Sequence, residues 1–204
     1  MAHMKKVAPF ISYLFHPLIM PSLGLLIIFN SGTYLALLDP AVKRAIMFVM
    51  ALGTLVFPLM MLPLLQYRNL VLKNGQVSTR GERLIPQIII LALYIITFVY
   101  FKRLPLSKVI HAYVLSVNAV FLVLVLVNLK FRVSMHTAAL GGLTGLIIAL
   151  IYLYQTPLQG FLMLSLLAAG LTGSSRLAMG AHWSELLSGF FLGFAMVLIT
   201  VLVY

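Results

Sequence analysis

The stretch at residues 108–129, KVIHAYVLSVNAVFLVLVLVNL, contains no Lys, Arg, Asp or Glu after Lys108. As a helix it would rise about 1.5 Å per residue, which is enough to cross the roughly 30 Å of hydrocarbon in a bilayer. Leucine and valine surround that helix on every side, whereas a surface helix of a soluble protein keeps a polar face. The stretch therefore predicts a transmembrane helix.

The whole chain has the same apolar character. Hydrophobic residues make up 63% of its 204 residues and charged residues 8%, whereas a soluble domain is about half apolar and about a quarter charged. Clusters of charge divide the chain into seven apolar segments. We place these at about 9–30, 45–66, 85–101, 108–129, 135–154, 157–173 and 185–203.

The first of these segments is unusual because it contains Pro17 and Pro21. Each proline lacks a backbone N–H, so this segment is expected to be kinked or re-entrant. We therefore predict one all-α integral membrane domain over residues 1–204, a bundle of six to seven transmembrane helices. Met1 to His3 are interpreted as an expression scar. The first apolar segment is interpreted as a retained helix, since no small-residue cleavage site follows it.

Two glycine pairs have the spacing of one helical turn, Gly141 with Gly145 and Gly189 with Gly193. Small residues four positions apart let helix backbones approach closely in a membrane. We predict that these two helices pack inside the bundle. The alternative is that glycine is simply common in membrane helices.

The net charge of the chain is +11, which indicates anionic partners. The cations lie in short loops between apolar segments, where they meet lipid head groups and phosphate, so no nucleic-acid partner is expected. The only carboxylates are Asp39, Glu82 and Glu185, too few to hold Mg²⁺ as a metal-dependent phosphatase would. The chain has no cysteine, which removes thiolate chemistry. We predict no metal site and no cofactor.

The loops after the second, fourth and sixth apolar segments must lie on one membrane face, because two crossings separate each from the next. These loops carry cations, hydroxyl groups and imidazoles: Lys73, Arg80 and Arg83 in the first, Lys130, Arg132, Ser134 and His136 in the second, and Ser175, Arg176 and His182 in the third. Arginine and lysine bind phosphate oxygens, and a serine hydroxyl can donate one more hydrogen bond. One histidine can attack phosphorus while the other protonates the leaving oxygen. The set predicts a site for a phosphate ester.

Each of these residues also has a structural interpretation. A loop lysine or arginine beside a membrane often anchors lipid head groups. The histidines could bond backbone or lipid at the interface, and as a zinc pair His136 and His182 lack a third ligand. His16 and His111 have no partners in these loops, and we interpret them as structural.

The three loops resemble the signature elements of the type 2 phosphatidic acid phosphatase family. The closest element is SSRLAMGAH at residues 174–182, which keeps the family's Ser-Arg-x5-His spacing. The sequence VSMH at 133–136 is similar to the Pro-Ser-Gly-His element. Lys73-x6-Arg80 is similar to the Lys-x6-Arg-Pro element, with Gly81 in place of proline, and Arg83 with Pro86 offers a shifted alternative. The resemblance covers about residues 73–200 and is closest to a short, divergent bacterial branch.

The resemblance implies a core like that of acid phosphatases and haloperoxidases, and it implies roles for the matched residues. His182 would be the nucleophile that forms a phosphohistidine, and His136 the general acid for the leaving group. The phosphoryl oxygens would be bound by Arg176, Ser134, Lys73, Arg80 and Arg83.

Two departures leave alternatives open. Leu186 stands where the family has the acidic residue that orients the nucleophile, and Glu185, one residue earlier, is the local substitute. Two apolar segments also separate elements that the family usually places in one stretch. Lys130 and Arg132, beside Ser134, are therefore possible substitute cations.

From these observations we expect an integral membrane phosphatase in a bacterial inner (cytoplasmic) membrane, acting on a phospholipid or polyprenyl phosphate or diphosphate. The alternative is a catalytically silent relative that binds or moves anionic lipids. An anion channel or transporter is less favoured, because its cations should line a span, whereas here they lie at the ends of spans.

Overall fold

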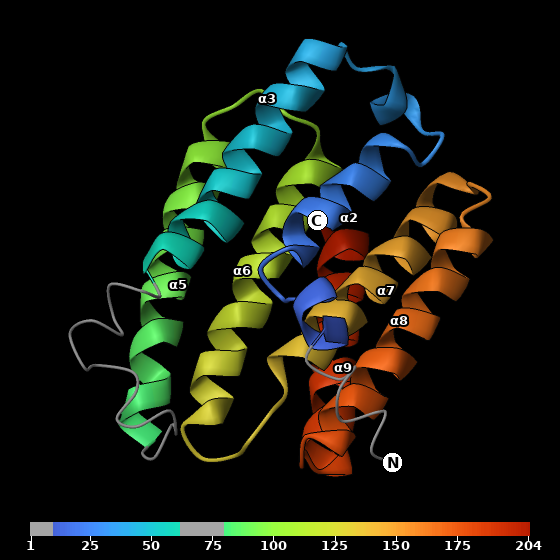
Figure 1. The fold of residues 1–204 in the computed structure, drawn as a ribbon. Coiled ribbons are helices and arrows are strands. Elements are labelled where there is room, and N and C mark those ends of the chain that lie inside the picture. Colours follow the sequence, from blue (N-terminus) through green and yellow to red (C-terminus); the bar gives the residue numbers. More distant parts are fainter. Residues whose placement is uncertain (1–9, 62–79) are drawn as a thin grey trace.

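The computed structural model describes residues 10–61 and 80–204, with side chains for 10–61 and 86–204. Every regular element in these ranges is helical, and no strand occurs in them. The helices run up and down as a bundle (Figure 1). The prediction of an all-α fold is therefore confirmed.

Five helices in the described ranges are long and apolar enough to cross a membrane. These are Pro40–Met61, α6 (Lys108–Asn128), α7 (Met135–Tyr154), α8 (Gln159–Ala178) and α9 (Trp183–Val203). The first of them contains α3 (Pro40–Ala51) and one π-helical turn, η2 (Leu52–Val56). Two further apolar helices are shorter, α2 (Met20–Phe29) and the Pro86–Lys102 part of α5 (Arg80–Lys102). Membrane crossing by the first and third apolar segments thus stays a prediction.

The first apolar segment is interrupted, as its prolines predict. Residues 10–14 are helical, residues 15–19 form a turn, and α2 begins at Met20. Pro17 has no N–H to donate, whereas Pro21 lies in the first turn of α2, where proline is tolerated. The N–H of Ile19 donates to the carbonyl of His16 at 3.0 Å and closes the turn. After α2, a short 3₁₀ helix, η1 (Tyr34–Leu37), leads into α3.

α7 is the most buried of the five candidate spans. The contact between α7 and α9 is the most extensive between any two described helices. α7 also contacts α8, α2 and α6. Leu140 and Ile147 of α7 are fully buried, whereas Leu164 and Leu171 of α8 are exposed on the outside of the bundle. Outward leucines suit contact with lipid, because hydrocarbon is as apolar as their side chains.

The contact between α7 and α9 depends on four glycines. A Cβ atom at Gly145 would lie 2.5 Å from the backbone oxygen of Phe194. At Gly141, Gly189 and Gly193 a Cβ atom would lie as close or closer to a backbone oxygen of the other helix or its N-cap. Any larger residue would therefore push the two backbones apart. The prediction that the glycine pairs allow close packing is confirmed, and α7 lies inside the bundle; α9 does not, because its other face exposes Leu187, Phe191 and Ile199.

The connections that the sequence assigns to one membrane face lie at one end of the bundle. Figure 1 shows the start of α5, the α6–α7 connection and the α8–α9 connection at that end. The backbone N–H of Ser134 donates to the carbonyl of Glu185 at 3.0 Å, which joins the α6–α7 connection to the first turn of α9. Asp39 caps α3 at the opposite end, where its carboxylate accepts a hydrogen bond from the N–H of Ala41.

Gly193→Ala is expected to destabilise the protein, because the new methyl group would meet the backbone carbonyl of Ala138. Overpacking of this kind costs about 1–3 kcal/mol. The matched control is Gly173→Ala in α8, where nothing lies within 4 Å of the new Cβ atom and alanine is the better helix former. Thermal unfolding of the purified protein in detergent should give a lower midpoint for Gly193→Ala than for Gly173→Ala. Equal midpoints would contradict the close backbone approach.

Candidate functional site

Ser134 ends the α6–α7 connection and caps α7. Its hydroxyl oxygen accepts a hydrogen bond from the N–H of Thr137 at 3.5 Å, and the side chain is buried. A hydroxyl group that accepts at a cap still has its own proton to donate. Ser134 therefore keeps one donor at the start of α7, which is what its predicted role in phosphate binding requires.

His136 is the second residue of α7, and its imidazole lies among polar groups from two other parts of the chain. It donates a hydrogen bond to the backbone carbonyl of Ser12, and the charge of Arg176 acts on it. Its ring lies edge-to-face with the ring of His16, with centroids 5.7 Å apart and an interplanar angle of 76°. A bonded carbonyl decides which ring nitrogen keeps a proton. The second nitrogen of His136 is then the one that can exchange a proton with a ligand.

His16 lies in the turn that contains Pro17. The backbone N–H of Leu18 donates to its Nδ1 at 3.3 Å, and the ring of Tyr13 flanks it with centroids 6.3 Å apart. Because Nδ1 accepts, the proton of the neutral ring lies on Nε2. The neutral His16 ring therefore presents one N–H donor, at Nε2.

Arg176 lies in the last turn of α8, beside this cluster. Its Nε atom is buried and has no hydrogen-bond partner among the described residues. The preceding residue, Ser175, is buried, and its hydroxyl oxygen lies 3.1 Å from that of Ser12, which ties residues 10–14 to α8. Leaving a buried donor unpaired costs about 1–3 kcal/mol. An anion that accepted a hydrogen bond from Arg176 would remove that cost.

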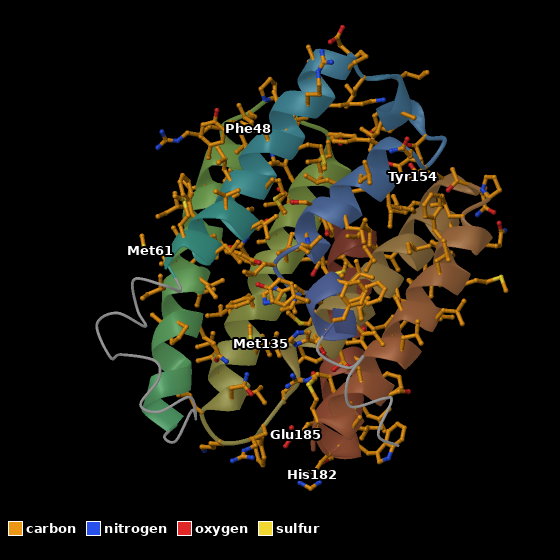
Figure 2. All side chains as sticks on the ribbon, viewed as in Figure 1. Phe48, Met61, Met135, Tyr154, His182 and Glu185 are labelled. Carbon is orange, nitrogen blue, oxygen red and sulfur yellow. The ribbon has the colours of Figure 1, made fainter. Side chains whose placement is uncertain are left out.

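His182 lies apart from this cluster. It is exposed, it is the N-cap residue of α9, and its side chain makes no capping hydrogen bond. Figure 2 shows it at the outer end of the bundle, beyond Glu185 and farther out than Met135. The neighbouring Leu186 is buried, with 3% of its surface exposed. The structure thus brings His136 and Arg176 together and leaves His182 outside their contact.

Lys130 and Arg132, the possible substitute cations, are exposed. Two aromatic side chains at the same end are also exposed, Phe131 at 68% and Trp183 at 65%. Aromatic and basic side chains together at the end of a membrane helix are typical of the head-group layer. The positions of Lys130 and Arg132 therefore favour lipid anchoring over contact with a phosphate bound at Arg176.

Four other predicted positions gain no further support from the geometry. Lys73 lies outside the described residues. Arg80 and Arg83 begin α5, and their side chains lie outside the described part of the structure. Glu185 is partly buried in the first turn of α9, and no hydrogen bond joins its carboxylate to His182 in the described ranges.

Sequence reasoning missed His16 and Ser12. The interpretation of His16 as a residue without a partner is wrong, because its ring contacts His136. A signal for it was present, since an ionisable side chain within an apolar segment marks a functional site in membrane proteins. His111 differs, because its Nε2 bonds the carbonyl of Phe101 at 3.0 Å, which supports its structural interpretation.

Comparisons of the chain with protein-family models, with curated proteins and with solved structures find no match. The resemblance to type 2 phosphatidic acid phosphatases therefore rests on the three sequence elements. The structure adds to them the contact of His136 with His16 and the nearby charge of Arg176.

Arg176→Gln is expected to weaken the binding of orthovanadate, a phosphate analogue, by about 10-fold or more. The reason is that a hydrogen bond to a charged group contributes about 1.5–3 kcal/mol. The control is Arg103→Gln, which removes an exposed cation beyond the other end of α5. Titration calorimetry of the detergent-purified variants measures both affinities. Equal losses in the two variants would mean that only the total charge matters.

Proposed function

We propose that this chain is an integral membrane phosphatase that removes phosphate from a lipid phosphate or diphosphate without a metal ion. The observation that carries this proposal is the unpartnered Nε of Arg176 near His136, at one end of a bundle with five candidate spans. A guanidinium group binds phosphate oxygens, and an imidazole can transfer a proton to or from the same ligand. Both residues belong to elements that resemble type 2 phosphatidic acid phosphatases, whose core we propose for residues 73–200.

The proposed reaction has two steps. His182 attacks phosphorus, so that a P–N bond forms while the P–O bond to the lipid breaks, and His136 gives a proton to the departing oxygen. Water then attacks the phosphohistidine, His136 accepts the proton of that water, and the P–N bond breaks to release inorganic phosphate. Because His182 is exposed, its role requires the imidazole to turn toward phosphate held at Arg176.

The negative charge that develops on the phosphoryl oxygens is stabilised by the groups that surround them. Arg176 supplies a cation with a buried donor, and Ser134 supplies a hydroxyl proton at the start of α7. Both groups are held by helix ends, so they need little rearrangement when charge develops on the phosphoryl group. Lys73, Arg80 and Arg83 are proposed to complete the binding set from the preceding connection.

A groove beside the cluster supports a lipid substrate. It has a volume of about 420 Å³, lies between α2, α7 and α8, and has an almost wholly apolar lining that includes Phe15, Leu23, Leu140, Phe161, Leu164 and Ala168. Phe15 is adjacent in sequence to His16, so the groove begins next to the polar cluster. A phospholipid or polyprenyl chain in the groove would leave its phosphate near Arg176. We propose a bacterial inner membrane as the location, following the resemblance.

A second function, binding or movement of anionic lipids without catalysis, is favoured by one specific observation. His182 is exposed and has no orienting carboxylate, because the matching position holds the buried Leu186. Binding of phosphate by Arg176 does not need His182. Both functions therefore predict that the protein binds phosphate, but only the phosphatase predicts turnover.

Phosphate release from phosphatidic acid or a prenyl diphosphate in detergent is expected to persist in EDTA and to fall with orthovanadate. Vanadate forms a trigonal bipyramidal adduct that resembles the transition state of in-line attack. Loss of turnover on chelation, with recovery on addition of Mg²⁺, would contradict the metal-free mechanism. Vanadate binding with no phosphate release from any of these lipids would favour the second function.

His182→Ala is expected to lower turnover by about 10³-fold or more, because it removes the proposed nucleophile. Its affinity for vanadate should change far less, since Arg176 and Ser134 are unaltered. His136→Ala should slow release of a lipid alcohol more than release of an activated aryl alcohol, because only the poor leaving group needs a proton. Turnover close to that of the wild type in His182→Ala would show that another residue is the nucleophile.

A further inference from the structure

We infer that His16 is a third imidazole of the phosphate site, and that its Nε2–H donates a hydrogen bond to an oxygen of the bound phosphoryl group. The inference rests on the proposed function for the chemistry of the ligand, a phosphate ester. It adds a residue that lies outside the three sequence elements, because His16 precedes them by more than 50 residues.

The first step concerns the orientation of the ring. The turn at residues 15–19 breaks the first helix, and the N–H of Leu18 would lack a partner there without the Nδ1 atom of His16. This hydrogen bond of 3.3 Å holds the ring and places its proton on Nε2. No hydrogen bond to another described residue occupies Nε2. His16 is therefore a fixed donor whose N–H has no protein acceptor in the described ranges.

The second step concerns what lies beside that donor. The ring of His136 is 5.7 Å away in an edge-to-face arrangement, and His136 is itself under the influence of the charge of Arg176. His136, at the start of α7, is thus in contact with His16 from the turn before α2 and near the charge of Arg176 from the end of α8. No carboxylate group has a hydrogen bond or ion pair with any of them in the described ranges. The Nε2–H of His16 and the Nε–H of Arg176 therefore lack an acceptor in the described ranges, and a phosphoryl group supplies several acceptors.

The third step concerns charge. A neutral imidazole donates a hydrogen bond to an anion without adding a further positive charge to a site that already has the cation of Arg176. The bond from Leu18 to Nδ1 keeps His16 in that neutral form. His136 can then be the one imidazole that gains and loses a proton, while His16 holds the phosphoryl group in place. His16 is accordingly a binding residue, with a role distinct from that of His136.

Orthovanadate binding to detergent-purified protein tests this assignment in three variants. His16→Phe keeps a flat ring against His136 and Tyr13 but removes both nitrogens. His16→Gln restores a side-chain N–H donor. His111→Phe is the matched control, because His111 bonds a backbone carbonyl away from the cluster. We expect His16→Phe to weaken vanadate binding by about 10-fold or more, as the loss of a hydrogen bond to an anion predicts. His16→Gln should recover most of that affinity, and His111→Phe should bind as the wild type does.

A second measurement uses the wild-type protein and does not depend on the folding of any variant. Imidazole ¹⁵N spectra of histidine-labelled protein should show His16 neutral with its proton on Nε2, as is also expected for His111, which bonds a carbonyl through Nε2. Vanadate should shift the Nε2 signal of His16 together with the signals of His136, and leave the signals of His111 unchanged. Vanadate affinity of His16→Phe equal to that of the wild type would overturn the inference. So would equal losses in His16→Phe and His16→Gln when both keep the wild-type unfolding midpoint, because packing and not donation would then be the role of His16. So would a His16 Nε2 signal that vanadate leaves unchanged.

The outcomes separate this inference from the proposed function. If the wild type releases phosphate and His16→Phe binds vanadate as the wild type does, the proposed phosphatase function stands and His16 is not part of its site. If vanadate binding depends on His16 but no phosphate is released, the binding role of His16 stands and the lipid-binding function is favoured over the phosphatase. A wild-type protein that neither binds vanadate nor releases phosphate would overturn both.

Discussion

The close approach of the α7 and α9 backbones is the interaction on which the rest of the bundle depends. In a membrane the hydrophobic effect does not drive helices together, so their association relies on packing and on hydrogen bonds between helices. Glycines on both helices remove the side chains that would keep the backbones apart, and the carbonyl groups of Phe190, Phe194 and Ala138 fill the space. This contact sets the start of α7 against the start of α9, where the N–H of Ser134 reaches the carbonyl of Glu185. The position of His136 follows from it.

The second constraint is the break in the first helix. Within a bilayer a backbone polar group without a partner is expensive, so an interrupted helix must find other partners for its N–H and C=O groups. Here the partners are imidazoles: His16 accepts from Leu18, and His136 donates to the carbonyl of Ser12. The hydrogen bonds that make the break tolerable also decide which nitrogen of each ring carries a proton. The same two hydrogen bonds therefore stabilise the interrupted helix and set the protonated nitrogen of each imidazole.

Burial separates the cations of this protein into two groups with different chemistry. Lys130 and Arg132 are exposed beside aromatic side chains, where water and head groups screen their charge. Arg176 holds a buried Nε atom without a partner among the described residues. A charge in a less polar environment acts on its neighbours more strongly. Arginine is thus exposed at the end of a span in one connection, whereas at the end of α8 it holds a buried donor without a partner in the described part of the chain.

Composition, hydropathy and the two glycine pairs were enough to predict the helical class, the approximate segments and the packing of α7 inside the bundle, because each follows from local sequence and the demands of lipid. The order of the loops also predicted which connections share one end, since crossing a membrane alternates the face. Contacts between distant segments could not be predicted in this way. The meeting of His16 with His136, the bond between Ser12 and Ser175, and the exposure of His182 depend on how the broken first helix packs against α7 and α8. Residue spacing does not tell how distant segments pack, so tertiary structure alone decided that His16 contacts His136 and that His182 is exposed.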